Sequence, residues 1–528
     1  MFNPLALLIN IFPDLQRLYK RDRDHSTFFA WLTVHGYNRF QVLREYPELL
    51  HAISLALSSS HSGLTPLQSV ILSRLKGLAQ AFPQPEQRQQ FLNWFYTYGV
   101  EECNLWPFLN EEEQKLVLSI GEPFRSRLRA AIAKQQYVAP KRRPFAKRKF
   151  GVNVIGYAFG QLGVGEDSRM ATRALLAARV PVTLVDFQPG DAVPQNDASM
   201  AKHVSKNGDY AINMFCMTAE ENARFYLERS SGQFNDRYSI GYWPWELGKF
   251  PKDWEMVLEL VDEVWVSTQH TYNSLRPVCS KPLQVMPMAV ELGEVMPFAN
   301  RKLARAHFKL PQAAKLFCFA FDLNSYIHRK NPQACIDAFL QAFPLQAKAG
   351  ADVGLVIKVH KPVRKNPLWE RLKKLAARDP RIHIIEGTLP RPELLALYQA
   401  CDCFVSLHRA EGFGRGLAEA LQLGLHVICT GYSGNVDFCH PPYADLVRYQ
   451  LVKVRASEYT QAKGQVWAEP DVKHAAQLMK QFVRNPPKRR KRKWPEFSAA
   501  VVGKRYEKRL REIMKLAPAV PSSFREKS

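Results

Sequence analysis

The chain reads Ser406-Leu-His-Arg-Ala-Glu411-Gly-Phe-Gly-Arg-Gly-Leu-Ala-Glu419-Ala-Leu421, so two glutamates stand eight positions apart. Glu411 falls on a glycine-rich loop, and Glu419 falls a little inside the helix that follows. Glycines let a backbone approach a ligand closely, and the free N–H groups at a helix start favour negative charge. Carboxylates accept hydrogen bonds from hydroxyl groups. The stretch therefore favours a site for a diphosphate and for hydroxyl-rich groups such as sugars and riboses.

Strands alternate with helices around this stretch, which predicts parallel sheets in an α/β fold. In the second half, strands are expected at Leu316–Phe321, Gly354–Val359, Ile382–Glu386, Cys403–Leu407 and His426–Thr430, with helices at Asn331–Phe343 and Pro392–Ala400. An earlier series is expected at Val152–Ala158, Pro181–Phe187, Tyr210–Cys216, Tyr238–Trp243, Glu263–Ser267 and Leu283–Met288, with a helix at Glu166–Ala178. Two such series predict two Rossmann-like domains, and sheets of this type bind ligands beyond the carboxyl ends of their strands.

The remaining segments complete the organisation of the chain. Residues 1–137 lack strand alternation, so we expect an all-α region with helices at 26–36, 65–82, 86–98 and 111–135. The predicted parts are a helical N-terminal region (1–137), a basic linker (138–150), a first Rossmann-like domain (151–297), a second Rossmann-like domain (298–485), and a basic segment with a last helix and tail (486–528). The last helix is expected over about 495–516.

The composition is that of a globular protein in a reducing compartment. Hydrophobic residues at 46% and charged residues at 23% are typical of a folded chain. Nine cysteines, an odd number without zinc-ligand spacing, indicate free thiols and a cytoplasmic location. No apolar run reaches the roughly 18 residues that a membrane helix needs, and the start lacks a basic secretory segment. The short apolar start, 5–12, instead predicts a helix that either packs against something or lies on a surface, such as a membrane into which it would insert shallowly.

The formal net charge of +24 is unevenly distributed, and two clusters stand out. One comprises Lys141–Arg143 with Lys147–Lys149, and the other is the run Lys488–Lys493. Such runs bind nucleic acid or an anionic membrane, or they form solvated linkers. No aromatic-glycine RNA motif accompanies them, so nucleic acid is not an expected partner. An anionic membrane surface is a candidate partner, and it would make a cytoplasmic protein peripheral on the inner face of the membrane.

The Glu411-x7-Glu419 spacing resembles the signature of retaining GT-B glycosyltransferases, most closely glycosyltransferase family 4. The resemblance covers about 151–516. It implies two Rossmann-like domains with a cleft between them and a last helix that crosses back to the first domain. It also implies an enzyme that moves a hexose from a nucleoside-diphosphate sugar to a polysaccharide or lipid-linked oligosaccharide acceptor, with retained configuration. Neither a cofactor nor a metal is expected.

The same resemblance implies roles for the residues of the Glu411 loop. Glu411 would contact hydroxyls of the transferred sugar, and Glu419 would hold the ribose of the donor. Main-chain N–H groups of the loop would contact the sugar and the phosphates, and the residues concerned are Gly412, Phe413 and Gly414. Arg415 departs from the apolar residue that commonly follows Gly-Phe-Gly, and this departure bears on the phosphate contacts.

The segment Phe321-Asp-Leu-Asn-Ser-Tyr-Ile-His-Arg-Lys-Asn-Pro332 resembles the family segment whose arginine and lysine neutralise the departing diphosphate. Lys330 takes the lysine role. The usual arginine comes several residues earlier, nearer Asn324, whereas Arg329 here adjoins the lysine. Lys358, at the end of the next strand, is a further candidate for the second positive charge. The alternative is a basic pair on the surface at a helix start.

A glycine-rich loop, Gly156-x3-Gly160-x2-Gly163-x-Gly165, joins the first strand to its helix. In family 4 such a loop lies next to the donor phosphates, so Gly163 and Gly165 are expected to bind the donor. The alternative is only a tight strand-to-helix turn. The order of the glycines differs from the dinucleotide fingerprint, so NAD is not implied.

Four further residues are candidate substrate contacts: His408, Asn435, Trp245 and Glu246. A histidine that supports the core or orients a neighbour is an equal alternative for His408. Asn435 lies in a family-like segment that flanks the donor. Trp245 and Glu246 follow a first-domain strand where many relatives place a sugar-binding histidine, and buried aromatic packing is the alternative for the tryptophan.

Two rival hypotheses about function stay open. One is another GT-B enzyme, such as a sugar epimerase or a phosphorylase-like enzyme. The other is a non-catalytic basic protein that binds a membrane or RNA on a GT-B scaffold. Both glutamates and Lys330 are present, which favours the transferase. The string Asp22-Arg-Asp24 matches the Asp-x-Asp of metal-dependent glycosyltransferases, but no strand precedes it, so a solvated face is expected there.

Overall fold

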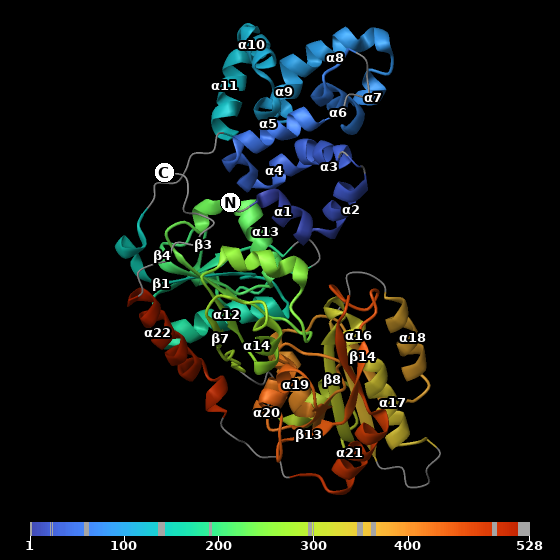
Figure 1. The fold of residues 1–528 in the computed structure, drawn as a ribbon. Coiled ribbons are helices and arrows are strands. Elements are labelled where there is room, and N and C mark those ends of the chain that lie inside the picture. The colour runs from blue at the N-terminus through green and yellow to red at the C-terminus, as the bar shows by residue number, and fades with distance from the viewer. Residues whose placement is uncertain are drawn as a thin grey trace.

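The computed structural model describes residues 3–21, 23, 25–57, 63–135, 143–189, 193–293, 298, 300–345, 352–360, 366–487 and 494–515. They form a helical N-terminal region and two α/β domains, with the first α/β domain in the middle (Figure 1). The predicted fold class, two Rossmann-like domains preceded by an all-α region, is confirmed.

The N-terminal region contains helices and no strand among the residues described before 143. Its helices are α1 (Pro4–Ile11), α2 (Pro13–Arg21), α3 (Ser26–Trp31), α4 (Tyr37–Arg39), α5 (Pro47–Ala56), α6 (Pro66–Arg74), α7 (Leu78–Ala81), α8 (Arg88–Trp94), α9 (Val100–Glu102), α10 (Glu111–Ser119) and α11 (Phe124–Gln135). The single helices expected at 65–82 and 111–135 are each broken in two. Gly77, with φ of +95°, lies in the first break, and Gly121 and Pro123 lie in the second.

The first α/β domain is a seven-stranded parallel sheet of order β3-β2-β1-β4-β5-β6-β7. Its strands are β1 (Lys149–Gly156), β2 (Val182–Asp186), β3 (Val204–Ser205), β4 (Tyr210–Phe215), β5 (Tyr238–Tyr242), β6 (Glu263–Val266) and β7 (Leu283–Val285), and its helices are α12 (Gly163–Ala177), α13 (Ala219–Arg229) and α14 (Gln269–Leu275). Helices cover both faces, which explains why the central strands are nearly continuous apolar runs. Only β3 was not expected, because two residues carry no periodic signal.

The second α/β domain is a six-stranded parallel sheet of order β10-β9-β8-β11-β12-β13. Its strands are β8 (Lys315–Asp322), β9 (Val353–His360), β10 (Ile382–Glu386), β11 (Cys403–Ser406), β12 (His426–Thr430) and β13 (Ala444–Val447). Its helices are α15 (Arg301–His307), α16 (Ile327–Lys330), α17 (Pro332–Ala342), α18 (Pro367–Ala376), α19 (Arg391–Ala400), α20 (Arg415–Gln422) and α21 (Val472–Arg484). An antiparallel pair, β14 (Tyr449–Lys453) with β15 (Val466–Pro470), was not expected.

The last helix, α22 (Ala499–Lys515), returns to the first domain and packs along α12 (Figure 1). It buries an apolar face there, formed by Val502, Tyr506, Leu510 and Ile513. Glu263 on β6 is fully buried and accepts hydrogen bonds from Arg509 of α22, with 2.8 Å between Arg509 Nη2 and Glu263 Oε2. Trp494 and Phe497, just before α22, belong to the core of the second domain, so this segment ties the two domains together.

The N-terminal region shares a hydrophobic core with the first α/β domain. Helix α1 buries Leu7, Leu8 and Ile11 and contacts α13 and the 3₁₀ helix 252–260. Asn3 caps this helix, because its side chain accepts hydrogen bonds from the first free N–H groups. The apolar start of the chain therefore packs on protein.

Parts of the two basic clusters lie outside the described residues. Lys141, Arg142 and the run Lys488–Lys493 lie outside the described residues, whereas Arg143, Lys147 and Lys149 are exposed. The nine cysteines form no disulfide. None of the described helices combines the length and the apolar character needed to cross a bilayer.

An alanine at Gly503 should weaken the docking of α22. A Cβ atom there would lie 1.9 Å from the carbonyl oxygen of Ala174 on α12, so the helices must separate. Overpacking of this kind costs about 1–3 kcal/mol, although alanine favours the helix itself. Urea unfolding of Gly503→Ala should show the loss, and Lys504→Ala, at an exposed position of the same helix, is the control. An unchanged free energy of unfolding in Gly503→Ala would contradict tight packing here.

Candidate active site

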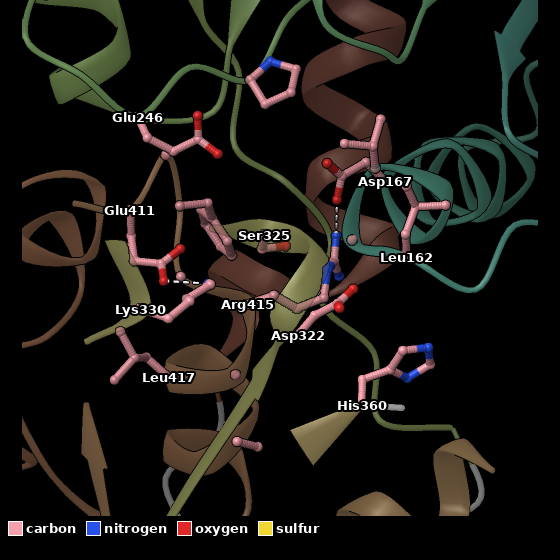
Figure 2. Close-up of a pocket in the computed structure, with 18 of the residues that line it drawn as sticks. Leu162, Asp167, Glu246, Asp322, Ser325, Lys330, His360, Glu411, Arg415 and Leu417 are labelled. Carbon is pink, nitrogen blue, oxygen red and sulfur yellow. Dashed lines mark hydrogen bonds and ion pairs between the residues drawn. The ribbon is translucent and has the colours of Figure 1, made fainter. Parts of the chain in front are cut away.

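Two adjoining cavities lie between the α/β domains. The Glu411 cavity has a volume of about 280 Å³ and is lined by Gly163, Asp167 and Glu246 of the first domain and by Lys330, Glu411 and Arg415 of the second (Figure 2). The Glu419 cavity has a volume of about 310 Å³ and is lined, among others, by Glu166 and Arg169 of the first domain and by Lys358, Arg391 and Glu419 of the second. The two glutamates that stand out in the sequence thus line neighbouring cavities.

The cavities lie where parallel strands end, as expected for sheets of this type. Gly163 follows β1, Lys330 follows β8, Lys358 lies near the end of β9, and Glu411 follows β11. Gly414, with φ of +94°, turns the Glu411 loop into α20, and the first three residues of that helix line the Glu411 cavity.

Glu411 is held by two cations. Lys330 Nζ donates to Glu411 Oε1 at 2.5 Å (Figure 2). Arg329 Nη1 donates to Glu411 Oε2 at 3.1 Å. Burial alone would raise the pKa of Glu411, but Lys330 and Arg329 lower it to about 2. The carboxylate therefore stays ionised at neutral pH and can accept hydrogen bonds but cannot act as an acid.

Arg329 and Lys330 differ in their surroundings. Arg329 is 4% exposed, also donates to the carbonyl of Ala410 at 2.9 Å, and lies 3.7 Å from Glu246. Burial and the neighbouring Arg329 lower the pKa of Lys330, while Glu411 raises it. Arg329 lines only the Glu411 cavity, whereas Lys330 lines both cavities.

His408 and Asn435 support the Glu411 loop from behind. His408 is fully buried, with Nδ1 2.9 Å from Ser406 Oγ and Nε2 2.9 Å from Asn435 Oδ1. Burial lowers the pKa of His408, which keeps the imidazole neutral. Neither residue lines either of the two cavities. The position of His408 therefore fits a histidine that orients a neighbouring side chain rather than one that contacts a substrate.

Glu419 projects from α20 into the second cavity and pairs with Arg391. Arg391 Nη1 donates to Glu419 Oε1 at 2.9 Å and lies 3.6 Å from Glu166 of the first domain. Lys358 lines the same cavity, and burial lowers its pKa to about 8 despite the nearby Asp322. Sequence reasoning missed Arg391, although its place at the start of α19, the helix that follows β10, was a usable signal.

Of the first-domain residues Gly163, Gly165 and Trp245, only Gly163 lines the cavities. Gly163 lines both cavities, whereas a Cβ atom at Gly165 would lie 2.3 Å from the carbonyl of Gly160, so Gly165 lets α12 pack against its own loop. Trp245 is buried and packs edge-to-face on Trp254, with ring centroids 5.1 Å apart. Gly165 and Trp245 line neither cavity.

Glu246 faces the Glu411 cavity from the first domain (Figure 2). Tyr459, on the connection between β14 and β15, donates to Glu246 Oε2 at 2.7 Å. No sequence signal pointed to Tyr459, because that connection carries no motif. Among the described residues, no group of three or more His, Cys, Asp or Glu side chains could hold a metal ion, and Asp22 and Asp24 lie outside these residues.

Comparison with known proteins adds a family match. Residues 323–494 match the sequence model of the family described as glycosyl transferases group 1, and this segment contains Lys330, Glu411 and Glu419. No curated protein sequence matches the chain. Two Rossmann-like domains facing an interdomain site, with a last helix that crosses back, form the GT-B architecture.

Solved structures with a similar fold include three of low identity. A sucrose-phosphate synthase from Thermosynechococcus elongatus is 17% identical, with 69% of this chain and 95% of that chain covered and a TM-score of 0.46. HepE from Anabaena, in complex with UDP and glucose, is 12% identical, with 69% and 100% covered and a TM-score of 0.48. A glycosyltransferase from Rickettsia africae is 13% identical, with 70% and 99% covered and a TM-score of 0.47.

Replacing Glu411 by glutamine should destabilise the protein in a pH-dependent way. The depressed pKa of Glu411 means that its stabilising contribution is complete above the ordinary value of 4.5 and is lost as the pH falls toward about 2. Breaking a buried ion pair from one side costs about 3–5 kcal/mol. Urea unfolding at several pH values should show a large difference from the wild type at neutral pH that shrinks below pH about 4.5. A difference that does not change with pH would contradict the ion-pair account.

Proposed function

We propose that this protein is a retaining glycosyltransferase of family 4 that transfers a hexose from a nucleoside-diphosphate sugar to a saccharide or lipid-linked saccharide acceptor. The observation that carries the proposal is the ionised Glu411, held by Lys330 and Arg329 in a cavity that continues to Glu419. The match of residues 323–494 to group 1 glycosyl transferases supports it.

In this proposal the donor spans both cavities. Its hexose lies beside Glu411, its ribose beside Glu419, and its diphosphate between them. Glu411 accepts hydrogen bonds from hexose hydroxyls, because its carboxylate is ionised and buried. Glu246, on the opposite wall, is placed to accept a hydrogen bond from a sugar hydroxyl, and its partner Tyr459 fixes its direction. Gly163 lets the first domain approach the phosphates closely.

Lys330 stabilises the leaving diphosphate. The bond between the anomeric carbon and the phosphate oxygen breaks while the acceptor oxygen bonds to that carbon, and negative charge grows on the diphosphate. A preorganised cation in a cavity shielded from water acts most strongly on charge that develops in the transition state. The acceptor proton passes to the departing diphosphate. No cofactor takes part, and cationic side chains take the place of a metal.

The experiment that tests this function has two stages. Thermal shift with UDP-, GDP-, ADP- and dTDP-sugars identifies the donor, and transfer of its hexose to saccharide or lipid-linked saccharide acceptors is then followed with and without EDTA. One donor should raise the melting temperature, and transfer should survive EDTA with the anomeric configuration retained. If no donor binds, the proposed function is wrong. Phosphate-dependent turnover without an acceptor would instead identify a phosphorylase-like enzyme.

We also propose a cytoplasmic location with peripheral attachment to an anionic membrane. The net charge of +24 and the exposed Arg143, Lys147 and Lys149 support this attachment. Each cation near such a surface contributes about 1 kcal/mol and is screened by salt.

Replacing Lys330 by alanine should act on the chemical step. Because Lys330 binds the transition state better than the ground state, kcat should fall on the order of 10²-fold with a smaller change in KM. Lys373→Ala is the matched control, since Lys373 pairs with Glu370 and Glu386 on the outer part of the same domain. Full turnover with only a raised KM would exclude this role for Lys330.

Replacing Glu419 by glutamine should weaken donor binding. Glutamine keeps the size but loses the charge-assisted hydrogen bond to the ribose, which is worth roughly 1.5–3 kcal/mol. Calorimetry with the donor should show this loss, whereas Glu393→Gln, on the neighbouring α19 and outside both cavities, should bind normally. Normal affinity in a folded Glu419→Gln would remove Glu419 from the site.

A further inference from the structure

Two cationic side chains occupy the junction of the cavities. Among the described residues, Lys330 and Arg415 are the lysine and arginine side chains that line both the Glu411 cavity and the Glu419 cavity. Arg329 lines only the first of these, and Lys358 and Arg391 line only the second. A ligand that extends from Glu411 to Glu419 must therefore pass Lys330 and Arg415.

Arg415 is also placed at a helix start. It is the first residue of α20, directly after Gly414, so its guanidinium adds to the positive end of that helix. Three of its N–H groups have described partners: Nη2 donates to Asp167 Oδ1 at 2.5 Å and to Met288 Sδ at 2.7 Å, and Nη1 donates to the carbonyl of Ala289 at 3.4 Å. A guanidinium has five N–H donors, so two remain for a ligand.

The partner of Arg415 comes from the other domain. Asp167 lies on α12 of the first domain, and Figure 2 shows its carboxylate against the Arg415 guanidinium. Burial raises the pKa of Asp167, and Arg415 opposes that effect. The adjacent Glu166 has a lowered pKa, because Arg391, Arg415 and Arg169 together outweigh its burial. Asp167 thus holds Arg415 in place, and Arg391 and Arg169 add further positive charge near it.

A diphosphate needs more positive charge than Lys330 alone provides. The charge of Lys330 is already shared with Glu411 at 2.5 Å. Arg329 faces Glu411 and Glu246 rather than the junction. Burial lowers the pKa of Lys358 to about 8, so part of its population is neutral near physiological pH. An arginine keeps its charge over this range and binds phosphate through two parallel hydrogen bonds.

We propose that Arg415 binds the diphosphate of the donor together with Lys330, and that Asp167 of the first domain positions Arg415 for this contact. This inference rests on the proposed function, because it requires a nucleoside diphosphate in the two cavities. It assigns diphosphate binding to the first residue of α20 and makes the diphosphate a bridge between the two domains.

The test separates phosphate binding from nucleoside binding. Calorimetry with UDP, GDP, ADP and dTDP, and with the matching nucleosides, is applied to the wild type, Arg415→Gln and Arg415→Lys. Arg415→Gln should lose about 10- to 100-fold in affinity for the diphosphate that the wild type binds, while nucleoside affinity stays the same. Arg415→Lys should recover part of this loss. Arg381→Gln, which removes an arginine paired with Asp379 away from both cavities, should bind as the wild type does.

Three outcomes decide the matter. Equal loss for the diphosphate and the nucleoside, or no loss at all, would overturn the role of Arg415 and leave it as a bridge between domains. Asp167→Asn tests the positioning role: it should lower kcat on the order of 10-fold with little change in nucleoside affinity, and unchanged kcat would overturn that role. If the wild type binds none of the four diphosphates, the proposed function itself fails and this inference fails with it.

Discussion

The buried ion pairs of Glu411 with Lys330 and Arg329 are the contacts on which the rest of the site depends. They join the loop after β11 to α16, the short helix after β8, with contacts of 2.5 Å and 3.1 Å between segments far apart in the chain. Removing Glu411 would leave Lys330 and Arg329 in a buried place without the carboxylate that they share, which costs far more than the loss of a surface pair. Because the carboxylate is fixed and ionised, the arrangement favours binding of hydroxyl groups and excludes proton donation from Glu411.

The same loop is also held by the first domain. Thr268 Oγ1 donates to the carbonyl of Gly412 in this loop at 2.7 Å. In the 3₁₀ helix that follows β12, Asp437 Oδ2 accepts from the N–H of Gln269 at 2.8 Å. Arg415 reaches Asp167 beside these contacts. The cavities therefore exist only while the two domains stay docked, and α22 contributes to this docking by packing on α12. A substitution that weakens the packing of α22 would therefore alter the two cavities, although no residue of α22 lines them.

Much of the α/β architecture could be predicted because parallel strands that helices cover on both faces have short, continuous apolar sequences. The expected strands 382–386 and 426–430 coincide with β10 and β12. The failures have local causes. Helices in the N-terminal region break at Gly77 and near Pro123. A prediction from residue propensities averages over such short interruptions and therefore gave one long helix in each place. The pair β14–β15 was missed since β14 is mostly exposed and forms no apolar run. The connection between the two strands packs on Trp245 through Tyr459, and this contact is long-range.

The sequence by itself determined the fold class and the nature of the main charges, because glycine loops, strand ends and the Glu411–Glu419 spacing are local features of the chain. It could not decide which charges meet. Tertiary structure placed His408 and Asn435 behind the loop, buried Trp245, and brought Arg391 to Glu419 and Asp167 to Arg415. The Asp167–Arg415 pair depends on the approach of the two domains, and the Arg391–Glu419 pair depends on packing within the second domain. Electrostatic interactions of this kind are set by distance and burial, which no local pattern in a sequence encodes.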